Sequence, residues 1–445
     1  MLPEPETRSQ TPTLQRVLGA AFGVAVTIGG TVGPGILRSP GFVAAQAASP
    51  AMMLALWAIG GFYALIGTMA VAELAALFPE AGGLYVYAKE AFGEAAGVTI
   101  GWSDLVATCA AAASIAVTGS DFAVALWPGL SGRETLFSIG VILFFAVIQW
   151  QGIRASGRMQ EWTSILQAGA VIFLIVCCFI WGGSAKTTAA VAIHHDPSWS
   201  ALSGAFLAMR YIIMDYDGWY SAIYFSEENR KSDGTLERSM IYGVLVIIVF
   251  YITLNAAFLY VLPIQQLASS KLAAADVAQQ MLGPTGARIV TLLSMIMAVA
   301  VIHPMILMNS RLAFSMGRSG LLWHKLSYVN AAGTPTYGLI LSTSLIVFFT
   351  ATGTFEKLSA IGSFLFVVNY ATSFIALLVM RHRASDLFRP FKARGVPWTI
   401  LTVILASGGY LVGVAWNDQT NSLIAACLLL LAYPATRLVR KLIQP

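Results

Sequence analysis

Apolar runs of about 20 residues dominate this chain, and they restrict its possible folds more than any other feature. Hydrophobic residues make up 57% of the 445 residues and charged residues only 11%, whereas a soluble domain has roughly a quarter of its residues charged. The short alternating segments of a membrane barrel are absent. The sequence therefore predicts an all-α integral membrane protein.

Twelve apolar spans are long enough to cross a bilayer as helices. Their approximate ranges are 16–40, 50–78, 95–127, 134–152, 159–182, 200–227, 239–262, 285–317, 337–353, 357–380, 397–415 and 420–437. The longest polar connections are Lys186–Trp199, Glu227–Arg238, Pro263–Pro284, Gly320–Pro335 and His382–Pro397. Each connection is too short to form a hydrophobic core, so no soluble domain is expected.

The basic residues predict how the chain is oriented. If both termini lie on one side, most of the 26 Lys and Arg residues fall on that side. An excess of positive charge marks the cytoplasmic side, which predicts a multi-pass protein of the cytoplasmic membrane with both termini in the cytoplasm. Because topology accounts for the net charge of +5, we expect contact with the lipid bilayer and no binding of nucleic acid.

The first span is interrupted by the stretch IGGTVGPGILRSPG, residues 28–41, with five glycines and two prolines. Broken helices at membrane depth are tolerated where the backbone is buried in protein or faces an aqueous cavity. The break would expose amide groups that favour anions and carbonyl groups that favour cations. A zwitterion such as an amino acid needs both, although a proline kink packed by small residues would explain the same stretch.

A second interruption lies in the sixth span, where YIIMDYDGWYSAIYFSEE, residues 211–228, carries two carboxylates and a glycine. Breaks five spans apart predict two five-helix repeats, the second inverted, with a solute site between the breaks. The predicted organisation is a cytoplasmic tail 1–15, a first repeat 16–182, a second repeat 200–380, helices 11 and 12 over 397–437, and a cytoplasmic tail 438–445.

Residues at the two breaks are the candidates for binding the solute. They are Thr31, Val32, Gly33, Gly35, Met214, Asp215, Tyr216, Asp217, Gly218 and Trp219. Carboxylates at membrane depth are rare and usually functional. We interpret Asp217 as a cap and indirect organiser in preference to a direct ligand. Asp215 either faces a substrate ammonium or pairs with Arg210.

Several longer stretches resemble a known family. They are GGTVGPGILRSPG, AELAALFPEAGGLYVYAKEAFG, YDGWYSAIYFSEE, SRLAFSMGRSGLLWHKLSYVNAAGTP and RPFKARGVPW. These stretches are similar to amino acid permeases of the amino acid–polyamine–organocation (APC) superfamily, and most of all to its L-type and serine/threonine exchanger branch. The resemblance implies a LeuT-type fold with twelve transmembrane helices, alternating access, and amino acids or related amines as substrates.

The chain also departs from the family pattern. Pro34 replaces a serine that normally offers an amide and a hydroxyl to the substrate carboxylate. Arg38 either replaces that donor or lies in an outer vestibule. Gln167 replaces a lysine associated with proton or sodium-like roles, which favours exchange over proton-coupled uptake. Met214 holds the usual position of a gating aromatic residue.

His303, just before Pro304 in the eighth span, is either a neutral structural residue or a proton-coupling group. Asp104 is expected near the membrane interface, and three glutamates near the cytoplasmic ends are expected to be solvated or paired with loops. These are Glu73, Glu227 and Glu228.

The motifs indicate neither catalysis nor a cofactor. The four cysteines lie in apolar runs without metal-ligand spacing, and no phosphate-binding loop follows Glu80. We therefore expect a transporter that is not an enzyme and holds no metal. A solute sensor with little transport is the alternative from another class. The sequence identifies no protein partner.

Overall fold

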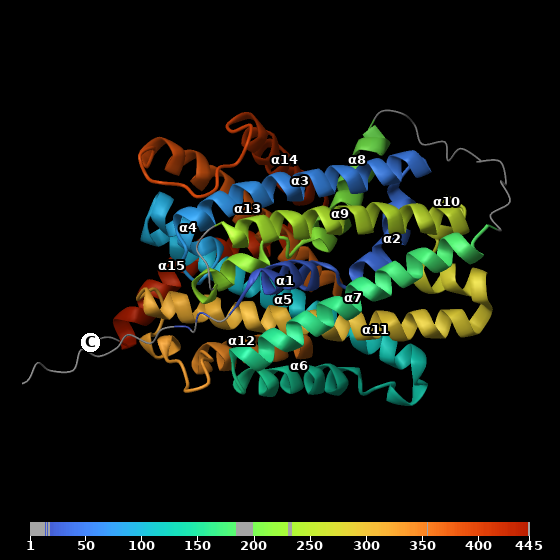
Figure 1. Ribbon diagram of the computed structural model, residues 1–445, viewed down its shortest axis with the longest axis horizontal. Coiled ribbons are helices and arrows are strands. Elements are labelled where there is room, and N and C mark those ends of the chain that lie inside the picture. The colour runs from blue at the N-terminus through green and yellow to red at the C-terminus, as the bar shows by residue number, and fades with distance from the viewer. Residues whose placement is uncertain are drawn as a thin grey trace, which may run out of the picture.

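The computed structural model describes residues 14, 16, 18–183, 199–229, 234–353 and 355–443. Helices account for nearly all of this described part (Figure 1). The first half contains α1 (Ala20–Thr31), α2 (Gly35–Gln46), α3 (Pro50–Leu77), α4 (Leu84–Phe92), α5 (Glu94–Leu126), η1 (Pro128–Leu130), α6 (Glu134–Trp150) and α7 (Ile153–Trp181). The rest contains α8 (Trp199–Tyr216), η2 (Ser221–Glu228), α9 (Thr235–Val261), α10 (Ile264–Ala268), α11 (Ala273–Arg318), η3 (His324–Ser327), α12 (Thr336–Thr352), α13 (Phe355–Arg383), α14 (Trp398–Asn417) and α15 (Gln419–Ile443).

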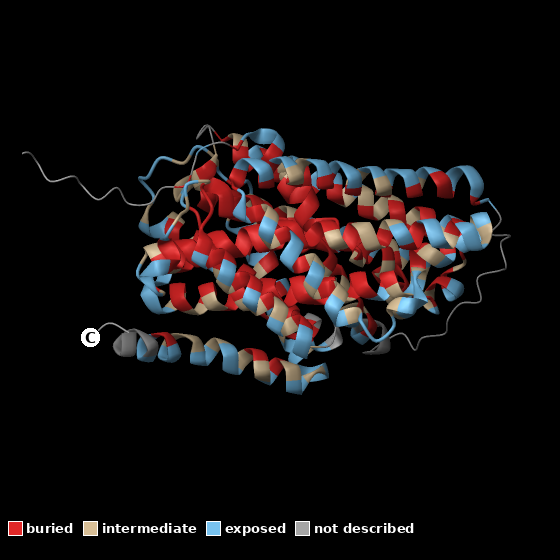
Figure 2. Ribbon diagram, turned by 90° about the horizontal axis from the view of Figure 1, so that it is seen from below, coloured by how far each residue is buried: buried red, intermediate tan, exposed pale blue. Residues whose placement is uncertain are grey.

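The described helices include eight that are long and apolar enough to cross a membrane, and the bent pair α1 and α2 makes a ninth. The remaining expected spans overlap α6, α12, and α8 with η2. Exposed residues line the outer faces of the helices (Figure 2). Many of them are large and apolar, such as Leu136 and Trp162, which are 70% and 71% exposed. Contact with lipid explains so much exposed apolar surface. The chain is a multi-pass membrane protein.

Three short helices lie where connections were expected. Helix α4 follows the third helix, and α10 and the first turns of α11 lie within the expected polar connection Pro263–Pro284. The sequence analysis did not predict these short helices, whose apolar residues, such as Leu267 and Val277, are fully buried. The expected connection Lys186–Trp199 lies outside the described residues except at its last residue.

The centre of the bundle holds α1, which packs against α7 and α9 (Figure 1). The long helices α5 and α11 pack together beside it, and α13 covers α5. By contrast, α14 and α15 lie at the edge of the bundle and are mostly exposed (Figure 2). The interrupted first helix is therefore buried in protein, as a broken helix at membrane depth requires.

Ion pairs join helices at the end of the bundle where α3 and η2 terminate. Glu73 of α3 binds Arg381 of α13 at 2.6 Å, and Glu228 of η2 binds Arg311 of α11 at 3.2 Å. Neither glutamate is solvated, because both are fully buried. Glu73 also contacts Arg389 and the Ala393 amide in the loop after α13, so pairing with a loop describes Glu73, whereas Glu228 pairs with a helix. Asp104 is also fully buried and accepts a 2.5 Å hydrogen bond from Tyr224.

Candidate functional site

The first break separates α1 from α2 at residues Val32–Pro34. The two helices are bent by 46° relative to each other. Proline 34 lacks an amide hydrogen and begins the turn into α2, where the Leu37 amide donates to the Pro34 carbonyl over 3.2 Å. The C-terminal end of α1 and the N-terminal end of α2 consequently face the same interior region with opposite partial charges.

The second break follows α8 and places Gly218 in a left-handed conformation. Its φ angle is 98°, which a glycine adopts without the strain of a side chain. The chain continues in η2, a 3-10 helix, and the Ser221 hydroxyl donates to the Gly218 carbonyl over 2.6 Å. The second half of the expected sixth span is therefore not α-helical.

The two breaks contact each other directly. A Cβ atom at Gly218 would overlap the carbonyl oxygen of Gly30, so the two backbones meet where neither residue has a side chain. The hydroxyl of Tyr251, from α9, lies 2.9 Å from the Thr31 carbonyl oxygen and 2.8 Å from that of Asp215. One tyrosine thus connects the ends of α1 and α8.

A cavity of about 190 Å³ lies at these breaks. Eight predicted residues line it, namely Thr31, Gly33, Gly35, Arg38, Arg210, Met214, Asp215 and Asp217. Its volume is below the usual range for drug-sized ligands, so it suits a small solute. The cavity combines carboxylate, guanidinium and hydroxyl groups with helix ends inside an otherwise apolar bundle.

The two aspartates of the cavity have different surroundings. Asp217 accepts a hydrogen bond from the hydroxyl of Tyr370 in α13, and its amide donates to the Met214 carbonyl over 3.3 Å. These contacts fit a cap that organises the turn. Asp215 lies against Gly35 at the start of α2, and its Oδ2 is buried without a hydrogen-bond partner among the described residues.

Comparison with known proteins identifies the family. The family model described as "Amino acid permease" matches residues 15–433. The chain belongs to the amino acid permease family. The family expected from the sequence motifs is thereby confirmed, and this permease is a membrane transporter and not an enzyme.

Relatives of this permease cover most of its length. It is 26% identical to the serine/threonine exchanger SteT of Bacillus subtilis over 401 residues, which are 88% of this chain and 90% of that protein. It is 26% identical to the b(0,+)-type amino acid transporter 1 of Mus musculus over 91% of this chain and 84% of that protein. The Asc-type amino acid transporter 1 of Mus musculus is 26% identical, over 86% and 74% respectively.

Four predicted residues lie beside the cavity without lining it. Val32 and Trp219 are buried, and Trp219 packs on Tyr370 with ring centroids 5.2 Å apart. Tyr216 donates to the Trp57 carbonyl over 3.2 Å. Gly218 packs against the carbonyl oxygen of Gly30 in α1. These residues hold the walls of the cavity in position, and sequence spacing could not distinguish them from the residues that line it.

The coupling candidates of the permease fall into two groups. Arg38 and Arg210 line the cavity, and the Arg38 guanidinium lies 5.8 Å above the ring of Phe42. Gln167 is buried on α7, and its Oε1 lies 3.2 Å from where a Cβ of Gly29 would be. Gln167 therefore faces the packed side of α1 and does not line the cavity.

His303 is buried where α6, α7 and α11 meet, and it does not line the cavity. The Gln149 amide nitrogen lies 2.8 Å from the His303 carbonyl oxygen and 3.3 Å from its Nδ1, while Nε2 lies 3.2 Å from the Ser156 carbonyl oxygen. These partners assign a neutral ring with the proton on Nε2. The imidazole also stacks on Phe145 at 5.4 Å. This environment favours the structural alternative.

The prediction missed about half of the cavity lining. The missed residues are Gly30, Pro34, Ser39, Phe42, Ala111, Ser114, Ile115, Thr118, Tyr211, Val301 and Met305. Ser114 and Thr118 of α5 lie four residues apart and so share a helix face. Together with the run of alanines before Ser114, this spacing was the available signal for a helix that leaves room for a solute.

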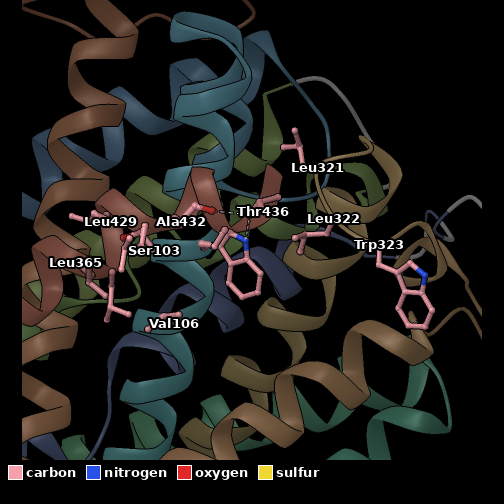
Figure 3. Close-up of a pocket in the computed structure, with 13 residues that line it drawn as sticks. Ser103, Val106, Leu321, Leu322, Trp323, Leu365, Leu429, Ala432 and Thr436 are labelled. Carbon is pink, nitrogen blue, oxygen red and sulfur yellow. Dashed lines mark hydrogen bonds between the residues drawn. The ribbon is translucent and has the colours of Figure 1, made fainter. Parts of the chain in front are cut away.

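A larger cavity of about 350 Å³ lies elsewhere, between α15, α5 and the segment after α11 (Figure 3). Leucines dominate its lining, and the Trp102 indole donates to the Thr436 hydroxyl over 2.8 Å. It contains no charged side chain and none of the predicted site residues. The smaller cavity between the breaks has charged side chains in its lining and is therefore the candidate solute site.

Proposed function

We propose that this permease is a secondary transporter that moves amino acids or related amines by alternating access. The observation that carries this proposal is the single cavity at which both helix breaks converge. A break in each of two repeats, with helix ends directed at the solute, suits alternating access around a fixed site. The cavity size and the mixture of charged groups fit a small charged solute.

The proposal includes twelve membrane spans arranged as two inverted five-helix repeats of the LeuT type. The repeats comprise residues 16–182 and 200–380, followed by two further helices. Support comes from the overlap of every expected span with a helix and from the matching positions of the two breaks. The peripheral location of α14 and α15 agrees with helices that lie outside the repeats.

We place both termini in the cytoplasm and the protein in the cytoplasmic membrane. The backbone amide of Leu18, just before α1, donates to the Glu228 carbonyl over 3.0 Å, so α1 begins at the end of the bundle that holds the buried ion pairs. The C-terminal helix α15 ends on the same side in Figure 1. Arg318, Arg381 and Arg389 also lie at this end, which agrees with an excess of cytoplasmic positive charge.

Exchange is the favoured mode of transport. Gln167, which replaces a lysine in the pattern expected from the sequence, provides no titrating group, and the environment of His303 favours a neutral imidazole. One of the relatives is named as an exchanger, SteT. These observations support exchange over proton-coupled uptake.

Reconstitution of the purified full-length protein into liposomes tests the proposal. Uptake of a labelled amino acid or amine should require unlabelled solute inside, and an imposed pH gradient should not drive uptake into empty liposomes. Uptake driven by the pH gradient would support proton coupling instead. Binding in detergent without transport in either liposome preparation would support a solute sensor and contradict the proposed transporter.

A further inference from the structure

The carboxyl group of Asp215 lies at the start of α2, and this position affects which substrates the cavity can bind. A Cβ atom at Gly35 would overlap Asp215 Oδ1, so this oxygen packs directly on the first residue of α2. Ser39, one turn further along α2, lines the same cavity. A carboxyl group of the protein itself therefore lies against the N-terminal turn of α2.

The N-terminus of a helix favours anions, because its first amide groups point outwards and the helix dipole is positive there. In the first helix break, this end would be the natural place for the carboxylate of an amino acid. With Asp215 already present, a substrate carboxylate at the same place would lie beside a like charge, which disfavours the ionised pair. Pro34 also offers no amide hydrogen to such a carboxylate.

The rest of the cavity favours a cation near Asp215. Asp215 is 7% exposed and lines the cavity, and its Oδ2 has no hydrogen-bond partner among the described residues. The Oγ1 of Thr31, also in the lining, is likewise buried and unpartnered in the described structure. The nearby C-terminal end of α1 adds partial negative charge. An ammonium group could donate to both oxygens.

Two arginines, Arg38 and Arg210, also line the cavity. Arg210 precedes Asp215 by five residues, or about 7.5 Å along α8. Arg38 follows Gly35 by almost one turn of α2. The carboxylate of an α-amino acid is attached to the carbon that carries the amino group, so both charged groups must bind side by side. A substrate carboxylate bound next to its ammonium would therefore lie close to Asp215.

We propose that Asp215 takes the place of a substrate carboxylate at the start of α2, so that the preferred substrate is an organic amine without a carboxylate on the carbon bearing its amino group. This inference rests on the proposed transport function and narrows its substrate class. Asp215 Oδ1 packs on the start of α2, and Oδ2 accepts a hydrogen bond from the substrate ammonium. Asp215 thus provides the carboxylate that an amino acid would otherwise bring to the start of α2, and the substrate provides only the ammonium group.

Matched pairs of an amino acid and its decarboxylated amine test this inference. Alanine with ethylamine, lysine with cadaverine, and phenylalanine with 2-phenylethylamine differ only in the carboxylate. Affinities come from the thermal stabilisation of the purified full-length protein, and countertransport in liposomes is measured with the same compounds. In at least one pair the amine should bind about tenfold more tightly, equivalent to about 1.4 kcal/mol.

Variants of Asp215 distinguish its roles. Asp215→Asn keeps the shape and should weaken amine binding about 30-fold or more, as expected for loss of one partner in a buried charge pair. Asp215→Gly frees the start of α2 and should reverse the preference in favour of the amino acid, a gain that misfolding could not produce. The exposed Asp386 provides the control, and Asp386→Asn should leave both affinities unchanged.

Two results would overturn the inference while leaving the transporter intact. One is tighter binding and faster countertransport of the amino acid in every pair. The other is an unchanged amine affinity in Asp215→Asn. If neither amino acids nor amines are transported by the wild-type protein in liposomes, the proposed function fails, and the inference fails with it.

Discussion

The hydroxyl of Tyr251 lies 2.9 Å from the carbonyl oxygen of Thr31, at the point where α1 ends. The same hydroxyl lies 2.8 Å from the Asp215 carbonyl oxygen, so a single side chain from α9 holds the ends of two broken helices at the cavity. Tyr251 is fully buried. The relative position of the two helix ends therefore depends on this residue.

Tyr251→Phe should weaken solute binding and destabilise the protein by about 1–3 kcal/mol, because buried carbonyl groups lose their donor. Thermal unfolding in detergent, with and without solute, measures both effects. Tyr63→Phe is the matched control, since Tyr63 hydrogen-bonds Ser407 at 2.8 Å between α3 and α14, away from the cavity. Tyr63→Phe should lower the stability of the protein without changing its affinity for solute. Equal loss of solute affinity in both variants would contradict a specific role for Tyr251.

Replacement of Gly218 by a larger residue should push the two helix breaks apart. In Gly218→Ala the new Cβ would overlap the Gly30 carbonyl oxygen, and the φ angle of 98° would strain any side chain. We expect a loss of about 2 kcal/mol or more of stability, and a loss of solute binding in the protein that remains folded. Gly218→Leu should abolish binding.

Gly409→Ala in α14 serves as the control for this replacement, because nothing lies within 4 Å of its Cβ position. It should leave binding and stability almost unchanged. Wild-type affinity in folded Gly218→Leu would exclude the second break from the solute site.

Loss of the buried ion pair between Glu228 and Arg311 should destabilise the protein far more than loss of the neighbouring pair between Glu227 and Arg318. Both side chains are at most 1% exposed, so Glu228→Gln leaves a buried guanidinium without its counter-charge, at a cost of about 3–5 kcal/mol. Glu227 and Arg318 form a 2.7 Å pair that is partly exposed, and Glu227→Gln should cost about 1 kcal/mol or less.

Denaturant unfolding in detergent micelles compares the two variants of this cluster. Adding Arg311→Met to Glu228→Gln should recover stability, because the unpaired charge is then removed. A double variant less stable than Glu228→Gln would show that Arg311 has another role.

His303→Asn should destabilise the protein by about 2 kcal/mol or more, and it should leave the pH dependence of solute affinity unchanged between pH 5 and 8. Protonation of Nδ1 would direct an N–H group at the Gln149 amide, which is itself a donor. The neutral ring is therefore the form that these contacts stabilise. Binding measured across this pH range checks the prediction, and a profile that flattens in His303→Asn would restore His303 as a coupling group.

The sequence by itself determined that the chain crosses a membrane repeatedly, and where two of its helices break. Both properties are local, since hydrophobic length fixes a span and glycine or proline interrupts a helix wherever the chain goes. The motifs also indicated the family correctly. The carboxylates of the sixth span could be located in the same way, because charge at membrane depth is visible in a linear pattern.

Only the tertiary structure decided what each of those residues contacts. Asp215 and Asp217 are two residues apart, yet one lies against the start of α2 and the other binds Tyr370 of α13. His303 and Gln167 were both named as coupling or gating candidates, and neither lines the cavity. Burial partners and like-charge neighbours depend on helices distant in sequence, so no local pattern encodes them, and they set whether a buried charge binds solute or holds the fold.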